Sequence, residues 1–303
     1  MAEGLDGIFL RSKSLIRIFF ILLFAAFALP ARAQAESLTR ARWLMGTLLE
    51  VTTFDLDSNT AADPVFDEVD RLERILSTFI EDSELSRLND AADGAPRPVS
   101  TDLWNVLTQS LEVARASGGA FDPTYGSTPK SRGFDRLRLN AKDRTVALAE
   151  GAVLNFGAIA KGYALDSAAR LIREAGVESA LLNFGGQILV IGESPVGDWP
   201  VIGASGLTLH VRDRSVSTSG LSQRPGHIRD PRSGAAIKGA GTVTVIARTA
   251  AAADAWSTAF FVSGMNPLPS DFDGCAIISS PDNKDARMTV GDCAQYLREE
   301  PAL

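Results

Sequence analysis

The chain has 303 residues, 45% of them hydrophobic and 22% charged, which is typical of a globular protein that buries a sizeable core in one large or two modest domains. Its formal net charge of -7 argues against nucleic acid or an anionic membrane as a partner, because both favour a basic surface. We therefore expect a small-molecule or protein partner.

The first 33 residues differ in character from the rest of the chain. Basic residues precede an apolar run from Ile18 to Leu29, and small residues occupy positions 31 and 33. This run is shorter than the roughly 20 residues that span a bilayer, so the pattern predicts a secretory signal peptide cut after Ala33. An uncleaved anchor is the alternative. We expect residues 34–303 to form an exported, periplasmic protein that keeps no stable membrane span after cleavage.

Apolar periodicity predicts a strand and then helices in the first part of the mature chain. The expected elements are a strand over 48–54, a helix over 65–76, a loop with a short helix over 77–89, and a helix over about 101–116 that ends at Gly118 and Gly119. The turn-rich loop 120–126 follows. It carries aromatic residues and the carboxylate of Asp122, and a purely structural turn is the alternative reading of it.

The sequence LNFGAIAKGYALD, residues 154–166, is the most distinctive stretch of the chain. A short apolar run meets a glycine, and small residues with one lysine, Lys161, lead into apolar residues at helical spacing. This order predicts a strand, a tight turn and a helix over about 158–175. Backbone N–H groups at the start of that helix, beside Lys161, would suit a phosphate group. The alternative is an ordinary packing turn between a strand and a helix.

The second half of the chain predicts mostly short strands. We expect two strands about a glycine turn within 179–192, and further strands near 199–203, 207–211, 215–219 and 242–247. Helices and strands come in groups, without a steady alternation of strand and helix. The expected fold class is therefore α+β, with largely antiparallel or mixed sheets and packed helices.

Two segments of the second half carry side chains suited to chemistry. His227 begins the sequence HIRDPRSG, and a histidine beside a carboxylate and two arginines is a candidate base, although a solvated turn is the commoner reading of such a segment in isolation. In a helix expected over 249–264, Asp254 and Thr258 share one face and offer two oxygens to Mg²⁺. So sparse a site makes sense only with a nucleotide present, and a helical aspartate near a threonine is the alternative.

The two cysteines of the chain are Cys275 and Cys293. Each borders a strand-like apolar run, and turn formers lie between them, so a hairpin folded near Lys284 would bring the two opposite each other. An oxidising compartment would allow a disulfide, and two free core thiols are the alternative. Two cysteines without neighbouring histidines make a poor metal site.

Together these motifs resemble the ApbE family, flavin transferases that move FMN from FAD onto proteins. The resemblance rests on LSTF, DSELSRLN, GGAFDPT, NFGAIAKGYALD, NFGGQ, STSG, HIRDPRSG and ADAWSTAFFVSG, which follow one another in the family's order between Met45 and Gly264. It implies that residues 34–303 form a single ApbE-like unit, undivided or in two subdomains, with a T-fold-related architecture.

The resemblance also implies an activity and a site. The activity is the Mg²⁺-dependent transfer of FMN from FAD to a threonine or serine hydroxyl of an exported acceptor protein, with release of AMP. Mg²⁺ is expected on the side chains of Asp254 and Thr258 and on the carbonyl group of Ala158, and His227 is the expected base. FAD is expected near Met45, Phe79, Ala120, Phe121, Asp122, Asn155 and Lys161.

Two positions depart from the pattern of the family. Asn155 stands where aspartate is usual, which removes a negative charge beside the expected metal site, and Phe79 stands where tyrosine is frequent, which removes a hydroxyl group. Two competing functions remain open. One is a Mg²⁺-dependent FAD pyrophosphatase, because water can attack the same phosphate, and the other is a non-catalytic exported FAD-binding protein.

Overall fold

The structure is a computed structural model that describes residues 37–54, 61–203, 206–221, 228–237, 241–264, 272–279 and 287–297. By its internal contacts the chain divides into residues 1–36 and residues 37–303. The expected signal peptide and His227 lie outside the described residues. None of the helices described is both long enough and apolar enough to cross a membrane.

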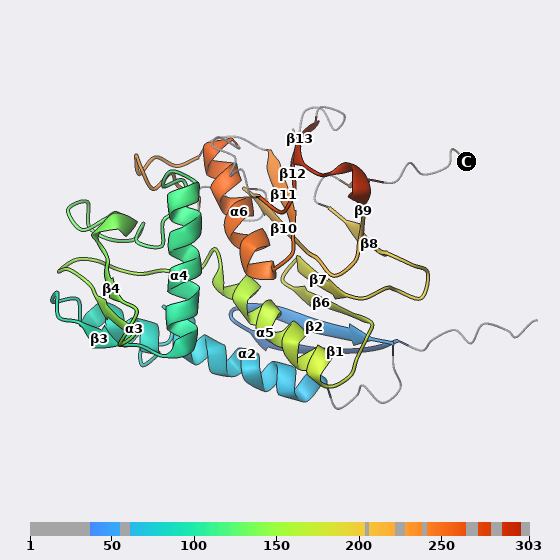
Figure 1. The fold of residues 1–303 in the computed structure, drawn as a ribbon, viewed down its shortest axis with the longest axis horizontal. Coiled ribbons are helices and arrows are strands. Elements are labelled where there is room, and N and C mark those ends of the chain that lie inside the picture. Colours follow the sequence, from blue (N-terminus) through green and yellow to red (C-terminus); the bar gives the residue numbers. More distant parts are fainter. Residues whose placement is uncertain are drawn as a thin grey trace, which may run out of the picture. The chain divides into compact units, whose positions relative to one another are not determined.

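Eight strands of the described chain pair into one large antiparallel sheet (Figure 1). In spatial order they are β1 (Leu38–Leu44), β2 (Thr47–Thr53), β6 (Ala180–Phe184), β7 (Gln187–Ile191), β10 (Ser215–Gly220), β11 (Thr242–Ala247), β12 (Gly274–Ser279) and β13 (Arg287–Gly291). Two-residue turns join β1 to β2 and β6 to β7. All four turn residues, Met45, Gly46, Gly185 and Gly186, have positive φ, as tight hairpins of this length require.

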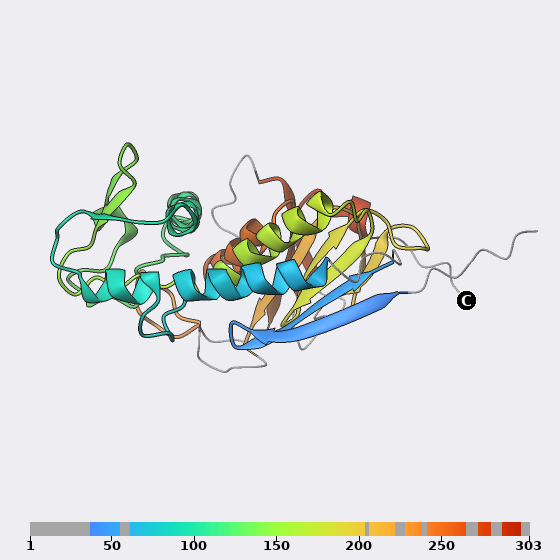
Figure 2. The same ribbon diagram turned by 90° about the horizontal axis from the view of Figure 1, so that it is seen from below.

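Three of the described helices, α2 (Ala62–Leu76), α5 (Ala160–Glu174) and α6 (Ala250–Ser263), cover one face of this sheet (Figure 2). α2 packs against β1 and α5, α5 packs against α6, and α6 lies over β10 and β11. Apolar residues spaced one helical turn apart, such as Val65 and Val69 of α2, are completely buried at this interface. The helical layer therefore brings the N-terminal parts of α5 and α6 together.

A separate strand pair, β8 (Trp199–Ile202) and β9 (Thr208–Val211), forms a second apolar cluster with the other face of the sheet and with the short helix η3 (Ala294–Tyr296). β12 and β13 form the predicted hairpin. Cys275 and Cys293 belong to this cluster and are joined by a disulfide with an S–S distance of 2.04 Å, which confirms the predicted bridge.

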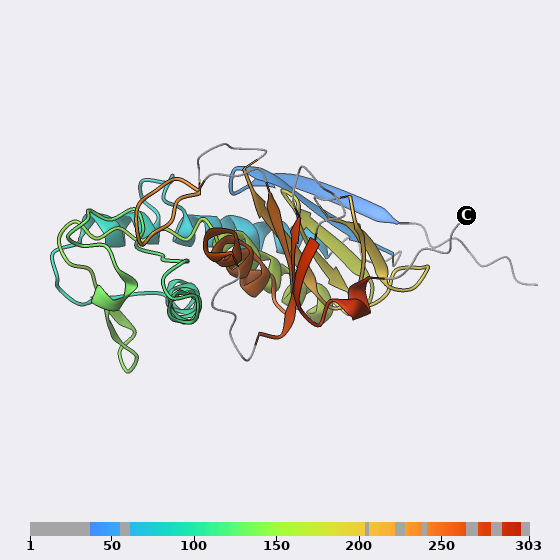
Figure 3. The same ribbon diagram turned by 90° about the horizontal axis from the view of Figure 1, so that it is seen from above.

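Helix α4 (Thr101–Ala116) contacts both α2 and α6. On its side away from the large sheet lie α3 (Glu84–Asp90) and a small sheet (Figures 1 and 3). Within the described residues that sheet consists of β3 (Arg97–Pro98), β5 (Thr145–Ala147) and β4 (Arg138–Asn140), and the short helix η2 (Phe134–Arg136) precedes β4.

The predicted α+β class with largely antiparallel sheets is confirmed, and so are the predicted helices and most of the predicted strands. The strand expected just before Lys161 was wrong, because residues 152–156 have no regular structure. The side-chain amide of Asn89 takes the place of a neighbouring strand. Its Oδ1 accepts from the N–H of Leu154 at 2.8 Å and its Nδ2 donates to the carbonyl oxygen of Leu154 at 2.9 Å.

Strand β1 and the small sheet were not predicted. β1 carries Arg40 and Arg42, which mask its alternating pattern. Both guanidinium groups lie over the ring of Phe66 in α2, at 5.9 and 5.0 Å from its centre, and pair with Asp63 and Asp67. These charged residues can line the covered side of an edge strand because another helix supplies both an aromatic face and the opposite charges.

Candidate functional site

The candidate site is built where the first turns of α5 and α6 cross. Gly162 of α5 lies so close to α6 that a Cβ atom on it would be 2.2 Å from the carbonyl oxygen of Ala250. Only glycine permits this approach. The crossing places Lys161 beside Asp254, although 93 positions of sequence separate the two residues.

Asp254 is 7% exposed, and Lys161 Nζ lies 4.0 Å from its Oδ2. The N–H of Gly162 donates to the same oxygen at 3.4 Å. Burial raises the pKa of Asp254 above its ordinary value, and the Lys161 ammonium and the Gly162 N–H oppose that rise. The sequence predicted free backbone N–H groups at the start of α5. The structure differs in one respect, because the N–H of Gly162 already donates to the carboxylate of Asp254.

Hydroxyl groups of β10 and α6 are in contact with one another about one helical turn beyond Asp254. Ser219 Oγ lies 2.8 Å from Ser257 Oγ and 3.3 Å from Thr258 Oγ1, and Ser257 Oγ donates to the carbonyl oxygen of Asp254 at 2.9 Å. Thr258 follows Asp254 by one helical turn, as the sequence predicted. The STSG motif at the end of β10 thus supplies a hydroxyl that contacts the Thr258 side chain.

The chemistry of these donors fits a magnesium ion. The Asp254 carboxylate is almost buried, and its contacts with Lys161 and Gly162 are both long, so its charge is incompletely compensated. Ala158, in the turn before α5, lies three residues before Lys161 in the sequence. The described residues contain no group of three or more His, Cys, Asp or Glu side chains that could hold a metal ion. A site with one carboxylate suits Mg²⁺, which retains water and takes phosphate oxygens as further ligands.

Asn155 shapes the turn that leads into α5. Its Oδ1 accepts from the N–H of Gly157 at 2.8 Å, and its own N–H donates to the carbonyl oxygen of Pro123 at 2.8 Å. The side-chain oxygen of an amide makes this turn as well as a carboxylate oxygen does. The departure at this position therefore removes a charge without removing the hydrogen bond seen here.

The loop after α4 is held by its own carboxylate. Asp122 Oδ1 accepts from the N–H and the hydroxyl group of Thr124 at 2.7 and 2.6 Å, and Thr124 Oγ1 accepts from the N–H of Gly133. The side chains of Ala120 and Phe121 are buried. Of the residues predicted to contact FAD in this loop, these three thus have visible structural roles.

Met45 and Phe79 both lie near the last turn of α2. The N–H of Met45, in the β1–β2 turn, donates to Glu73 Oε2 at 2.9 Å. Phe79, between α2 and α3, is 98% exposed, so its ring is available to a ligand. The structure brings Lys161, Asp254 and Thr258 together, but it shows no contact that joins Phe79 to them.

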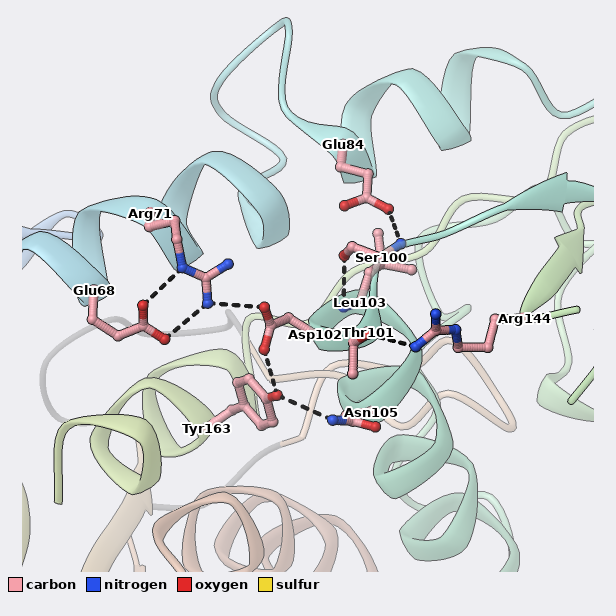
Figure 4. Close-up of polar contacts among 10 residues, drawn as sticks. All are labelled: Glu68, Arg71, Glu84, Ser100, Thr101, Asp102, Leu103, Asn105, Arg144 and Tyr163. Atoms are coloured by element: carbon pink, nitrogen blue, oxygen red, sulfur yellow. Dashed lines mark hydrogen bonds and ion pairs between the residues drawn. The ribbon is translucent and has the colours of Figure 1, made fainter. Parts of the chain in front are cut away.

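Sequence reasoning missed the polar network that anchors the start of α5 to α4 and α2 (Figure 4). Tyr163 donates its hydroxyl hydrogen to Asp102 Oδ1 at 2.8 Å, and Arg71 bridges Asp102 to Glu68. Burial raises the pKa of Tyr163 to about 12, so the phenol remains a donor at neutral pH. Tyr163, two residues after Lys161, could have indicated this network from the sequence. Its partners, however, come from helices that are distant in sequence.

Comparisons with known proteins point to one family. The model of the ApbE family matches residues 45–270. An FAD:protein FMN transferase of Treponema pallidum is 32% identical, over 77% of this chain and 80% of its own. One from Escherichia coli K12 is 27% identical, over 78% of this chain and 81% of its own. The crystal structure of the ApbE protein of Thermotoga maritima has a similar fold, with a TM-score of 0.77 and 23% identity over 87% of this chain and 100% of its own. The chain belongs to the ApbE family.

Proposed function

We propose that this protein transfers FMN from FAD to a threonine or serine hydroxyl of an exported acceptor protein. The acceptor oxygen attacks the phosphorus atom on the FMN side of the diphosphate, a new phosphoester bond forms, and the bond to the AMP phosphate breaks so that AMP leaves. Membership of the ApbE family and the names of the relatives support this activity. The observation that carries it is the approach of Lys161 to Asp254 at a helix crossing rich in hydroxyl groups.

The residues of the site have complementary roles in this proposal. Asp254, Thr258 and the carbonyl group of Ala158 would hold Mg²⁺, which when bound neutralises charge on the diphosphate. Lys161 would add a second positive charge on the phosphates. Asp254 is nearly buried and Lys161 is partly buried, so the charges of the two side chains are screened less by water than charges at an open surface.

The remaining predicted residues would bind the flavin nucleotide and remove a proton. The exposed ring of Phe79 offers a surface for stacking, and Met45, Asn155 and the loop 120–122 are proposed to shape the nucleotide site. His227 is proposed to take the proton from the acceptor hydroxyl.

We also propose that the protein is exported to the periplasm after cleavage of residues 1–33. The disulfide between Cys275 and Cys293 supports this location, because such bridges persist in oxidising compartments.

The experiment that tests the function is incubation of the mature protein with FAD, Mg²⁺ and an acceptor domain that carries a candidate threonine. Covalent flavin fluorescence on the acceptor, with AMP formed in equal amount, supports the proposal. An acceptor with that threonine replaced by valine is the matched control and should stay unlabelled. Free FMN with AMP and no labelled acceptor would instead indicate a pyrophosphatase. Intact bound FAD would indicate a binding protein.

A further inference from the structure

Asp166 is a motif residue that the proposed chemistry does not use. It lies on α5 one turn after Gly162, and its two carboxylate oxygens accept from the first two N–H groups of α6, Ala250 at 2.7 Å and Ala251 at 2.9 Å. The Thr249 side chain accepts from the next N–H, that of Ala252, at 3.2 Å. The N-terminal donors of α6 are thus satisfied chiefly by a side chain from another helix.

The two helices cap each other. Asp254, one turn after Ala250, accepts from the N–H of Gly162 in the first turn of α5, while Asp166 accepts from the first turn of α6. Gly162 and Ala250 touch at the crossing, and Gln187 Nε2 of β7 donates to the carbonyl oxygen of Ala250 at 2.8 Å. The first turns of the two helices and the two carboxylates therefore form a closed ring of contacts. Gly162, the residue after Lys161, is part of this ring.

The two carboxylates of this ring are held very differently. Asp166 has two short hydrogen bonds, whereas Asp254 has one long one at 3.4 Å. Burial raises the pKa of Asp166 to about 6, while the N–H groups of Ala251 and Ala250, which donate one to each of its oxygens, favour the ionised form. Asp166 is committed to the helix crossing, and Asp254 retains the capacity to bind a cation.

We propose that Asp166 is a positioning residue that holds the N-terminus of α6 so that Asp254 faces Lys161 and the nucleotide phosphates. The inference rests on the proposed function, in which Asp254 holds Mg²⁺. Replacing one oxygen of Asp166 by an amide nitrogen would turn a donor toward a backbone N–H, so α6 would shift at Ala250 or Ala251. The shift would be transmitted over one helical turn to Asp254.

The test is the Mg²⁺ dependence of FAD binding without an acceptor, measured by flavin fluorescence in the full mature protein. We expect Asp166→Asn to raise the half-saturating Mg²⁺ concentration about 10-fold or more, in keeping with the loss of a hydrogen bond to a charged group. FAD binding without Mg²⁺ should stay close to that of the parent. Glu84→Gln is the matched control, because it alters a carboxylate that likewise accepts from a backbone N–H, that of Ser100 at 2.6 Å, without touching α5 or α6. Its half-saturating Mg²⁺ concentration should remain parental.

Equal Mg²⁺ shifts in Asp166→Asn and Glu84→Gln would overturn the positioning role, as would a parental value in a folded Asp166→Asn variant. If Asp166→Asn does not fold, Asp166→Glu decides, because it keeps the negative charge and lengthens the side chain that accepts from the N–H groups of Ala250 and Ala251. A higher half-saturating Mg²⁺ concentration in Asp166→Glu then supports the role and a parental one refutes it. Asp254→Asn separates this inference from the proposed function: if that variant keeps the parental Mg²⁺ dependence, the metal assignment is wrong, and the positioning role falls with it.

Discussion

Gly162 and Ala250 meet backbone to backbone, at a distance that would leave an added Cβ atom 2.2 Å from a carbonyl oxygen. This contact sets the spacing of α5 and α6. It consequently sets the distance between Lys161, beside Gly162, and Asp254, one turn beyond Ala250.

Gly162→Ala should separate the two helices. We expect a loss of stability of about 3 kcal/mol or more, at the upper end of what overpacking costs, because the atoms it meets belong to backbone. Urea unfolding measures this. Gly176→Ala is the control, since Gly176 has φ +79° and open space around the added atom, and should cost only about 1 kcal/mol. Equal losses in the two variants would show that the crossing tolerates a side chain.

Asp254→Ala and Thr258→Ala should each abolish FMN transfer while the fold is retained, because each removes one of few protein oxygens proposed for Mg²⁺. Circular dichroism and the rate of acceptor labelling measure the two effects. Thr218→Ala is a matched control, since Thr218 pairs with Thr244 on the other side of β10 from the site and should leave transfer near the parental rate. Full activity of Asp254→Ala with Mg²⁺ present would contradict the assignment.

Reduction of the Cys275–Cys293 bridge should lower the melting temperature and leave transfer intact. The bridge closes a short loop, for which a contribution of about 3 kcal/mol is expected, and it lies with the cluster on the face of the sheet opposite α6. Alkylation of the unreduced, denatured protein tests the bridge directly. An unchanged mass supports it, and two added labels would refute it.

His227→Ala should leave FAD binding nearly intact and slow transfer by roughly 10²–10⁴, which is the usual contribution of general acid–base catalysis. The parent should show a rate that rises with pH near the reference histidine pKa of about 6.5, and the variant should lack that rise. His210→Ala is the control, because His210 lies in β9, in the strand pair on the other face of the large sheet. If His227 only shapes its loop, FAD binding or stability should fall in proportion to the rate. A variant that keeps the pH dependence would exclude His227 as the base.

Much of the local structure followed from the sequence alone. The spacing of apolar residues predicted α2, α4 and α5, and the run of small residues closed by Gly264 predicted α6. The pair Gly185 and Gly186 predicted where β6 turns back into β7. All these signals depend on residues close together in the chain. The order of the motifs pointed to the family, and the hairpin between Cys275 and Cys293 followed from the turn formers between them.

Tertiary structure decided what these motifs do. Asp254 and Lys161 become neighbours only because Gly162 lets two helices cross, and Asp166 gains its role only from the N-terminus of a helix that begins 84 positions later. Leu154 has no strand partner because the side chain of Asn89 supplies its hydrogen bonds. Arg40 can lie in a strand because its guanidinium group stacks on the ring of Phe66 and pairs with Asp63. Local periodicity records which face of an element is apolar. It does not show which distant backbone or charged groups will contact that face, and in this protein those contacts build the candidate site.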